Sequence, residues 1–143
     1  MKRFPITCLA VVLLLAARAL TAAGGFLVVV NAANPVESLP AVEVSRIFMH
    51  RVLQWPSGMQ VSAVDLPEDA PARVAFTRAV HGKTVASIKG HWQTMIFSGR
   101  DVPPPERSSA EVLGFVRSEV GAIGYVAPGT TLGDGVKILR VTP

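Results

Sequence analysis

The sequence predicts an α/β fold in which helices pack against a central mixed or parallel sheet. Two apolar runs of the kind that form buried strands lie far apart, at residues 25–31 and 122–126. Between them, several segments repeat apolar residues at the spacing of amphipathic helices. Strands mixed with helices in this way are typical of one sheet covered by helices. No internal repeat or long linker divides residues 24–143, so we expect a single domain there.

The first strand and helix are predicted near the start of this domain. Residues 25–31, Gly-Phe-Leu-Val-Val-Val-Asn, form a continuous apolar run, which fits a strand buried on both faces, as in a parallel sheet. Asn34-Pro35 ends the run. A helix is then predicted over residues 40–49, with Ser38 as the candidate N-cap.

A second strand, over residues 60–66, leads into the most regular helix of the sequence. Residues 66–71 form the approach to this helix, and Gly82 ends it. Its apolar residues follow the i, i+3, i+4, i+7, i+8 pattern of a helix with one buried face: Ala72, Ala75, Phe76, Ala79 and Val80.

The next helix is predicted to begin after Thr84 as its cap and to stop at Ser98-Gly99. Trp92 lies on its apolar stripe, so we expect this side chain to pack in the core rather than line a cleft. The full stripe comprises Val85, Ile88, Trp92, Met95 and Ile96.

A loop over residues 100–109 holds three consecutive prolines, and Ser109 is predicted to cap the helix that follows. Residues 122–126 form a short apolar strand, and residues 136–141 alternate as in a half-exposed edge strand. The inner residues of the helix are Val112, Leu113, Val116 and Val120, and Gly121 closes it.

The N-terminus predicts a secretory signal peptide. A basic start at residues 1–3 precedes an uncharged apolar run over residues 6–17, which is too short to cross a membrane as a helix. Thr21-Ala22-Ala23 provides small residues at a cleavage site, so we predict cleavage after Ala23. The alternatives are cleavage near residues 17–19 and an uncleaved anchor at the membrane surface.

Removal of this segment changes the composition that bears on function. The chain divides into a signal peptide, 1–23, and a periplasmic or secreted domain, 24–143. Cys8 is the single cysteine, so the mature domain has no thiol for a disulfide, a zinc site or catalysis. The formal net charge of +4 includes three cations of the signal peptide. Without them, 11 of the 14 Lys and Arg residues face 10 Asp and Glu residues, a net charge of +1, so a nucleic-acid partner is not expected.

Motifs for catalysis or metal binding are weak in this sequence. His50, His81 and His91 lack the spacing that places two ligands on one helix face, so we expect surface or capping histidines. No Gly-x-Ser-x-Gly elbow occurs, and we predict neither an enzyme nor a cofactor. Scattered arginines are usually solvated, although five of them are candidate clamps for an anion: Arg51, Arg73, Arg78, Arg100 and Arg107.

Three segments together resemble the phosphate-binding proteins of ABC transporters, within the type 2 periplasmic binding protein superfamily. They are Val-Val-Val-Asn at 28–31, the run from Ser-Arg-Ile-Phe to Trp at 45–55, and Gly-Ala-Ile-Gly-Tyr-Val at 121–126, and Phe76 also falls where this family has it. The resemblance covers residues 25–141 and about half of a full binding protein. It implies a single lobe of the superfamily's fold.

The residues that hold phosphate in this family have no equivalents here. The family holds its oxyanion with an Arg and a Ser-Gly-Thr segment at the start of the second predicted helix, where this sequence has Leu66, Ala70 and Ala72. Glu68 and Asp69 place carboxylates where a helix N-terminus would otherwise favour an anion. The resemblance therefore implies the fold and lineage, but no phosphate-ligating residue.

We expect a periplasmic solute-binding module related to phosphate uptake, with a small anion as its solute. The candidate contact residues are Asn31 at a strand end, Asp69 and Arg73 at a helix start, and Tyr125 in the later strand. Because one lobe leaves a ligand half exposed, a partner or a second copy would have to cover it. The alternative is an interaction or sensor-accessory protein that binds no ligand and docks on a membrane transporter or sensor.

Overall fold

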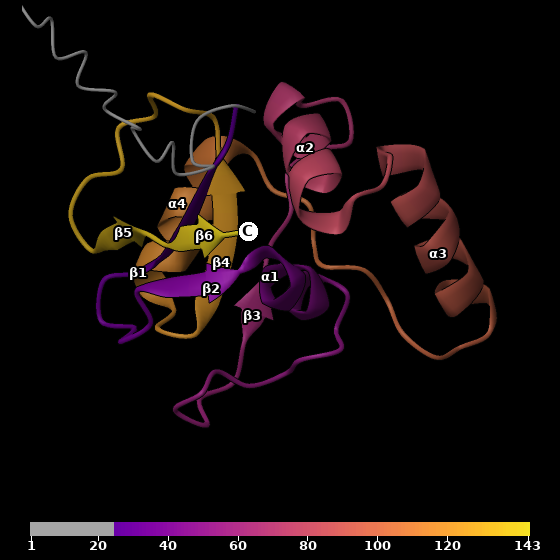
Figure 1. The fold of residues 1–143 in the computed structure, drawn as a ribbon, viewed down its shortest axis with the longest axis horizontal. Helices are drawn as coiled ribbons and strands as arrows, with labels where there is room; N and C mark the ends of the chain where they lie inside the picture. Colours follow the sequence, from indigo (N-terminus) through magenta and orange to yellow (C-terminus); the bar gives the residue numbers. More distant parts are fainter. Residues whose placement is uncertain (1–24) are drawn as a thin grey trace, which may run out of the picture.

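A four-stranded sheet forms the centre of the computed structural model, which describes residues 25–143 (Figure 1). The predicted signal peptide, with Cys8 and the cleavage site after Ala23, lies outside the described residues. The elements follow in the order β1 (Leu27–Asn31), β2 (Ser38–Pro40), α1 (Ala41–Phe48), β3 (Ser62–Ala63), α2 (Pro71–Phe76), the π-helical turn η1 (Thr77–His81), α3 (Val85–Phe97), α4 (Ser109–Ser118), β4 (Ala122–Val126), β5 (Val136–Ile138) and β6 (Arg140–Thr142).

The sheet is mixed, as predicted, and β1 lies inside it. The strand order is β3-β4-β1-β5, with β3 parallel to β4 and β1 antiparallel to both of its neighbours. Val28, Val29 and Val30 are buried, which confirms a strand covered on both faces. The expectation that β1 would lie in a parallel sheet was wrong. A continuous apolar run indicates that a strand is buried, but it does not indicate the direction of its neighbours. A second, two-stranded sheet pairs β2 with β6 in parallel.

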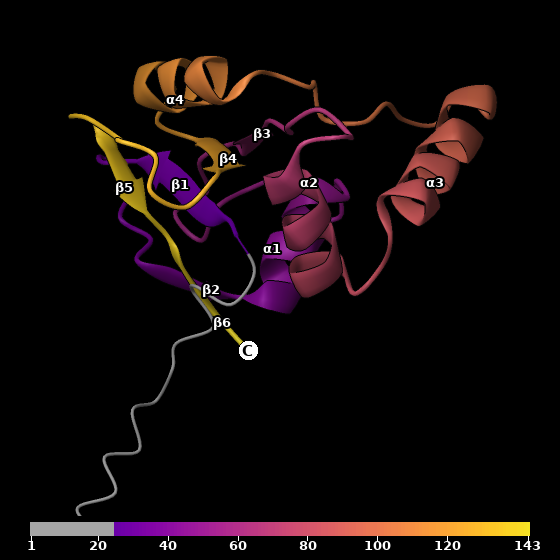
Figure 2. The ribbon, with the colours of Figure 1, turned by 90° about the horizontal axis from the view of Figure 1, so that it is seen from above.

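Helices cover both faces of the central sheet (Figure 2). On one face α4 packs against β4 and β1, so closely that a Cβ added at Gly124 would lie 2.6 Å from Val112 Cγ1 and 3.0 Å from Val64 Cγ2. On the other face, aromatic rings of α1 and α2 pack on Tyr125 of β4. The predicted α/β fold with helices on a central sheet is therefore confirmed.

The regular helix predicted after Pro71 changes its hydrogen bonding halfway. It starts as α2, becomes π-helical in η1, and ends at Gly82, whose φ of +63° is typical of a left-handed helix cap. Thr77 is buried at the start of the π-helical turn, and its hydroxyl donates to the Arg73 carbonyl over 2.7 Å. Ala79, predicted on the buried face, is exposed, because the buried face of the helix runs instead through Arg73 and Thr77.

Several element ends differ from the predicted ones. Ser38 belongs to β2 and Pro40 occupies the N-cap of α1, so Ser38 does not cap that helix. Ser108, not Ser109, caps α4, by accepting a hydrogen bond from the Glu111 N–H over 3.3 Å. Val120 lies beyond the end of α4 and is exposed.

The edge strand predicted over residues 136–141 is two strands that belong to different sheets. β5 pairs with β1, and β6 pairs with β2. Leu139 lies between them and is buried. The alternation of buried and exposed residues therefore continues although the chain passes from one sheet to the other. The two strands close the fold beside the start of the described chain.

Helix α3 stands away from the body of the protein (Figure 1). Only Ile88 and Trp92 of its predicted stripe are fully buried, whereas Ile96 is exposed and Phe97 has 90% of its surface exposed. Trp92 is buried, but it lies outside the main core cluster and packs against the His50 and His91 rings, each 5.1 Å away. Thr84 caps the helix as predicted, by accepting from the Ser87 N–H.

Within residues 25–143, no helix is both long enough and apolar enough to span a bilayer.

Substitution of Gly124 by Ala should destabilise the protein, because the new methyl group would press into Val112 and Val64. We expect a loss of about 1–3 kcal/mol in the free energy of unfolding, as for other overpacked cores. The matched control is Gly90→Ala in α3, where a Cβ meets open space and should stabilise the helix by about 0.5–1 kcal/mol. Urea unfolding measures both; an unchanged midpoint for Gly124→Ala would contradict the packing described.

Candidate solute-binding site

A buried charge cluster holds the loop that leads from β3 into α2. Asp65, Arg73 and Tyr125 form this cluster, and all three are buried. Arg73 reaches back along the chain, and its Nη1 donates to the Leu66 carbonyl over 2.6 Å. The Arg73 guanidinium, in α2, thus binds the backbone at the beginning of the loop that precedes this helix.

The three side chains of the cluster meet at one carboxylate oxygen. Arg73 Nη1 lies 3.4 Å from Asp65 Oδ1, and the Tyr125 hydroxyl donates to the same oxygen. The Leu66 N–H in turn donates to the Tyr125 hydroxyl over 3.5 Å. Phe76 stacks on Tyr125, with ring centroids 3.9 Å apart and planes 5° from parallel. The segment after β3, the loop before α2, the helix α2 and the strand β4 are therefore joined through one buried carboxylate oxygen of Asp65.

A second loop reaches the same cluster from far along the chain. Glu106 Oε1 lies 3.6 Å from Arg73 Nη1, and the backbone of Asp65 pairs with the segment around Glu106. The Asp65 N–H donates to the Pro105 carbonyl over 2.9 Å, and the Arg107 N–H donates to the Asp65 carbonyl over 2.8 Å. Arg73 therefore has two carboxylates close to its guanidinium.

Burial dominates the electrostatics of this cluster. Desolvation raises the pKa of Asp65, and the neighbouring Arg73 opposes that rise. Burial also raises the pKa of the Tyr125 hydroxyl, and the Asp65 carboxylate raises it further, so the phenol keeps its proton and donates it. The polar atoms of these groups form hydrogen bonds with one another, and the positive charge of Arg73 is neutralised inside the protein.

The exposed rim above the cluster is acidic. Asp69 is exposed, and Glu68 pairs with Lys89 of α3 over 3.1 Å. Ala70 occupies the N-cap of α2 without a side-chain hydrogen bond, and its own N–H is bonded to the Pro67 carbonyl. This rim offers carboxylates rather than the donors that an oxyanion requires.

The structure places the four predicted contact residues in two different places. Arg73 and Tyr125 come together in the cluster, and Asp69 lies on the rim of the same loop. Asn31 lies at the end of β1 and binds α4, since its Nδ2 donates to the Val116 and Arg117 carbonyls over 2.9 and 3.1 Å. Its Oδ1 accepts from the Ala33 N–H. Their roles as solute contacts stay predictions.

Sequence reasoning missed Asp65 and Glu106. Asp65 lies just after β3, where a strand passes into a loop, and polar loop residues are often functional, so its position was a usable signal. Glu106 follows three prolines in a loop and lies far from Asp65 in sequence, so nothing local indicated the contact.

Each of the three histidines has a neighbour in the structure, but they do not converge. His50, with φ of +55°, lies 3.0 Å from Asp101 through its Nδ1. His81 Nδ1 lies 2.7 Å from the Ser45 hydroxyl, and His91 contacts the Trp92 ring. Among residues 25–143, no group of three or more His, Cys, Asp or Glu side chains is placed to hold a metal ion.

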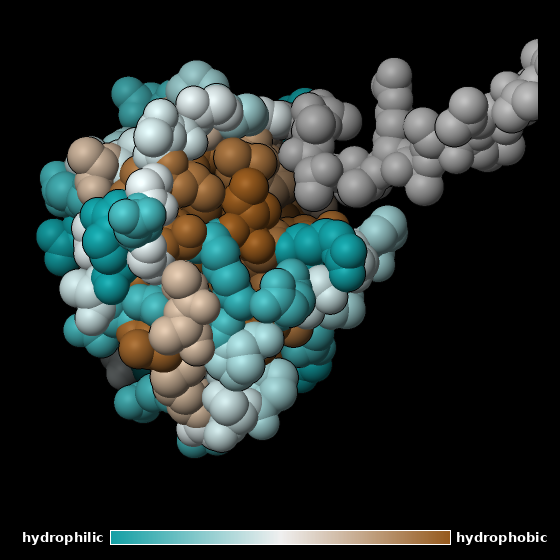
Figure 3. Space-filling model, turned by 90° about the vertical axis from the view of Figure 1, so that its left-hand side faces the viewer, coloured by the Kyte–Doolittle hydropathy of each residue, from teal (hydrophilic) through white to brown (hydrophobic). Residues whose placement is uncertain are grey.

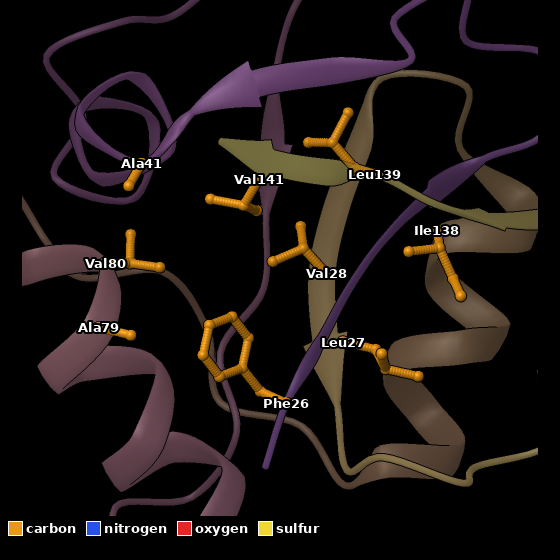
Figure 4. Close-up of a pocket in the computed structure, with 9 residues that line it drawn as sticks. All are labelled: Phe26, Leu27, Val28, Ala41, Ala79, Val80, Ile138, Leu139 and Val141. Atoms are coloured by element: carbon orange, nitrogen blue, oxygen red, sulfur yellow. The ribbon is translucent and has the colours of Figure 1, made fainter. Parts of the chain in front are cut away.

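An apolar hollow lies beside β1 and β6, away from the cluster. Figure 3 shows apolar side chains gathered on the face that carries β5 and β6, and Figure 4 shows Phe26, Val28, Val80 and Val141 turned toward one another. The hollow encloses about 20 Å³, which is room for about one water molecule. It is too small for a solute.

Comparison with known proteins identifies the fold. No protein-family model matches the sequence, and no curated protein matches it either. Three solved structures share its fold. The first is described as a phosphate ABC transporter substrate-binding protein from Clostridium perfringens with bound phosphate. It is 18% identical with a TM-score of 0.62, over 82% of this chain and 44% of that one.

The other two structures agree with the first. An ABC-type phosphate transport receptor from Vibrio cholerae is 18% identical with a TM-score of 0.61, over 80% of this chain and 45% of that one. A protein from Planctomyces limnophilus, described as phosphate-binding, is 17% identical with a TM-score of 0.60, over 83% of this chain and 45% of that one. The chain thus has the fold of such proteins and spans less than half of their length.

Substitution of Arg73 should destabilise the protein strongly, because it leaves Asp65 buried without its cation. We expect Arg73→Ala to cost about 3–5 kcal/mol in the free energy of unfolding. Tyr125→Phe, which removes only the hydroxyl, should cost about 1–3 kcal/mol. The control is the exposed Arg78 of η1, whose substitution by Ala should change stability by less than about 0.5 kcal/mol. Equal effects at Arg73 and Arg78 in chemical unfolding would contradict the cluster's role.

Stability should fall as the pH falls from about 7 to 4, because His81 resists protonation in the folded protein. Burial, with the nearby charges of Arg73 and Lys83, lowers its pKa to about 4. The unfolded chain therefore binds the proton more tightly in this range, and folding loses at most about 3 kcal/mol at the acid end.

The His81→Gln variant tests this pH dependence, since glutamine can still hydrogen-bond to Ser45 but does not titrate. Its unfolding free energy should vary less between pH 7 and 4 than that of the original protein. Parallel curves for the two proteins would show that His81 is not responsible.

Proposed function

We propose that the protein is an exported solute-binding module, related to those that capture phosphate for ABC transporters, and that it takes a small anion. The observation that carries this proposal is the fold, which agrees over most of the chain with proteins described as phosphate-binding. The sequence segments at 28–31, 45–55 and 121–126 support the same lineage. On this proposal the protein binds its solute without turnover, as a binding protein rather than an enzyme.

The proposed module needs the surface of another protein chain to cover its solute. A solute held on one lobe keeps much of its surface in water, which limits affinity. Because the chain spans less than half of the proteins whose fold it shares, we propose that another chain or a second copy covers the solute. A membrane transporter component is the proposed recipient.

The contacts of the four predicted site residues favour different roles. Arg73 and Tyr125 act as positioning residues, since their polar atoms already bond to Asp65 and Leu66 inside the protein. Asn31 positions the end of α4 in the same way. Asp69 is the one whose side chain lies on the exposed rim, available to a hydroxyl or amine group of a solute.

Thermal unfolding with and without solutes tests the proposal. The full chain, expressed in an exporting bacterial host, should be recovered without residues 1–23, as intact mass will show. A bound small anion should raise the unfolding temperature, since a ligand at 100 times its Kd adds about 2.7 kcal/mol. The panel comprises millimolar phosphate, sulfate and small organic anions. No shift with any of them contradicts solute binding.

A second candidate function is an interaction module that binds no solute and docks on a membrane transporter or sensor. The exposed apolar side chains beyond the body of the protein, Ile96, Phe97 and Val102, favour it. This candidate expects no thermal shift in the same assay. It also expects Phe97→Ser to weaken association with the transporter or sensor component while leaving the unfolding temperature unchanged.

A further inference from the structure

A hollow between α1 and the junction of η1 with α3 has the size and chemistry of a ligand site. It is open to solvent and has a volume of about 270 Å³. A water molecule takes about 30 Å³ in the liquid, so the hollow has room for a molecule of several heavy atoms rather than a single small ion. It lies beside the far end of the α2–η1 helix from the acidic rim at Asp69.

Three cations surround this hollow, and two of them have no counter-ion among residues 25–143. Arg46, Arg51 and Lys83 line it, and none of its lining residues is acidic. Arg46 pairs with Glu43 over 3.1 Å, but no carboxylate among residues 25–143 pairs with Arg51 or Lys83. Like charges held around one concave surface repel one another, and a bound anion would relieve that repulsion.

The other lining residues combine a polar pair with apolar surface. Ser45 and His81 hydrogen-bond to each other, with 2.7 Å between Oγ and Nδ1. The apolar lining consists of Ile88, which is buried, with Val42 and Met49. A ligand that suits this surface has an anionic group for the cations and a short hydrocarbon part for the apolar wall.

We propose that this hollow is the binding site for a small organic anion, a short carbon skeleton that carries a phosphate or two carboxylates. The inference rests on the proposed function in taking a small anion as the solute, and it moves the solute away from the acidic rim. Arg51 and Lys83 hold the anionic group. Ile88 and Val42 contact the carbon skeleton.

His81 provides an independent signal of an occupied site. The groups that face it are Arg73 of α2, Lys83 after η1, Ser45 of α1 and the Phe76 ring, which lies 5.5 Å away. The cations among them disfavour its charged form, and a bound anion acts in the opposite direction. Nuclear magnetic resonance of the His81 ring should therefore show its titration move to higher pH when the site is filled.

Calorimetric titration of the protein recovered from the exporting host tests the site. The probes are glycerol phosphate and succinate, with inorganic phosphate, sulfate and uncharged glycerol for comparison. We expect glycerol phosphate or succinate to bind, and Arg51→Ala or Lys83→Ala to weaken that binding at least fivefold each. Both side chains are exposed, so both variants should fold. The control is Arg100→Ala, an exposed arginine outside the hollow, which should leave binding within twofold.

The outcomes separate this inference from the proposed function. Binding that Arg51→Ala and Lys83→Ala leave unchanged would overturn the site while the proposed function stands. Binding of inorganic phosphate or sulfate alone would overturn the organic ligand class. If no anion binds at all, the inference and the proposed function both fail.

Discussion

The buried contact between Arg73 and Asp65 is the interaction on which the rest of this structure depends. A charged pair in the interior is stable only when its remaining hydrogen-bonding atoms are also satisfied. Here the Tyr125 hydroxyl and the Leu66 carbonyl meet that requirement, and they come from the centre of the sheet and from the loop before α2. One charged pair thereby fixes the end of a strand, a loop and a helix relative to one another.

This pair also leaves the loop before α2 with little positive charge to offer an external anion. An arginine that neutralises a buried carboxylate has little charge left for an external anion, and the rim above it carries Glu68 and Asp69. Two cations that pair with no carboxylate among residues 25–143, Arg51 and Lys83, line the hollow at the far end of the α2–η1 helix. The chain has the fold of proteins described as phosphate-binding, but Arg73 is bound inside the protein, and Arg51 and Lys83 lie on another surface.

Local sequence patterns predicted the parts of the fold that depend on local physics. The buried β1, the helix around Phe76 and the Thr84 cap all followed from burial patterns, spacing and capping. Strand direction in β1, the split of residues 136–141 between two sheets and the approach of Glu106 to Arg73 did not, because each depends on contacts between distant segments. Arg73 and Tyr125 were identified as candidate site residues, but no sequence pattern showed that both of their polar groups would bind the Asp65 carboxylate.

A double-mutant cycle between Asp65 and Arg73 tests the central claim most directly. Arg73→Met leaves the Asp65 carboxylate buried without its cation, and Asp65→Leu leaves the Arg73 guanidinium with only the exposed Glu106 beside it. The double variant removes both buried charges. We predict that the double variant loses less unfolding free energy than the sum of the two single variants, by at least about 2 kcal/mol. Losses that add within about 0.5 kcal/mol would mean that the two charges do not depend on each other, and would contradict the account.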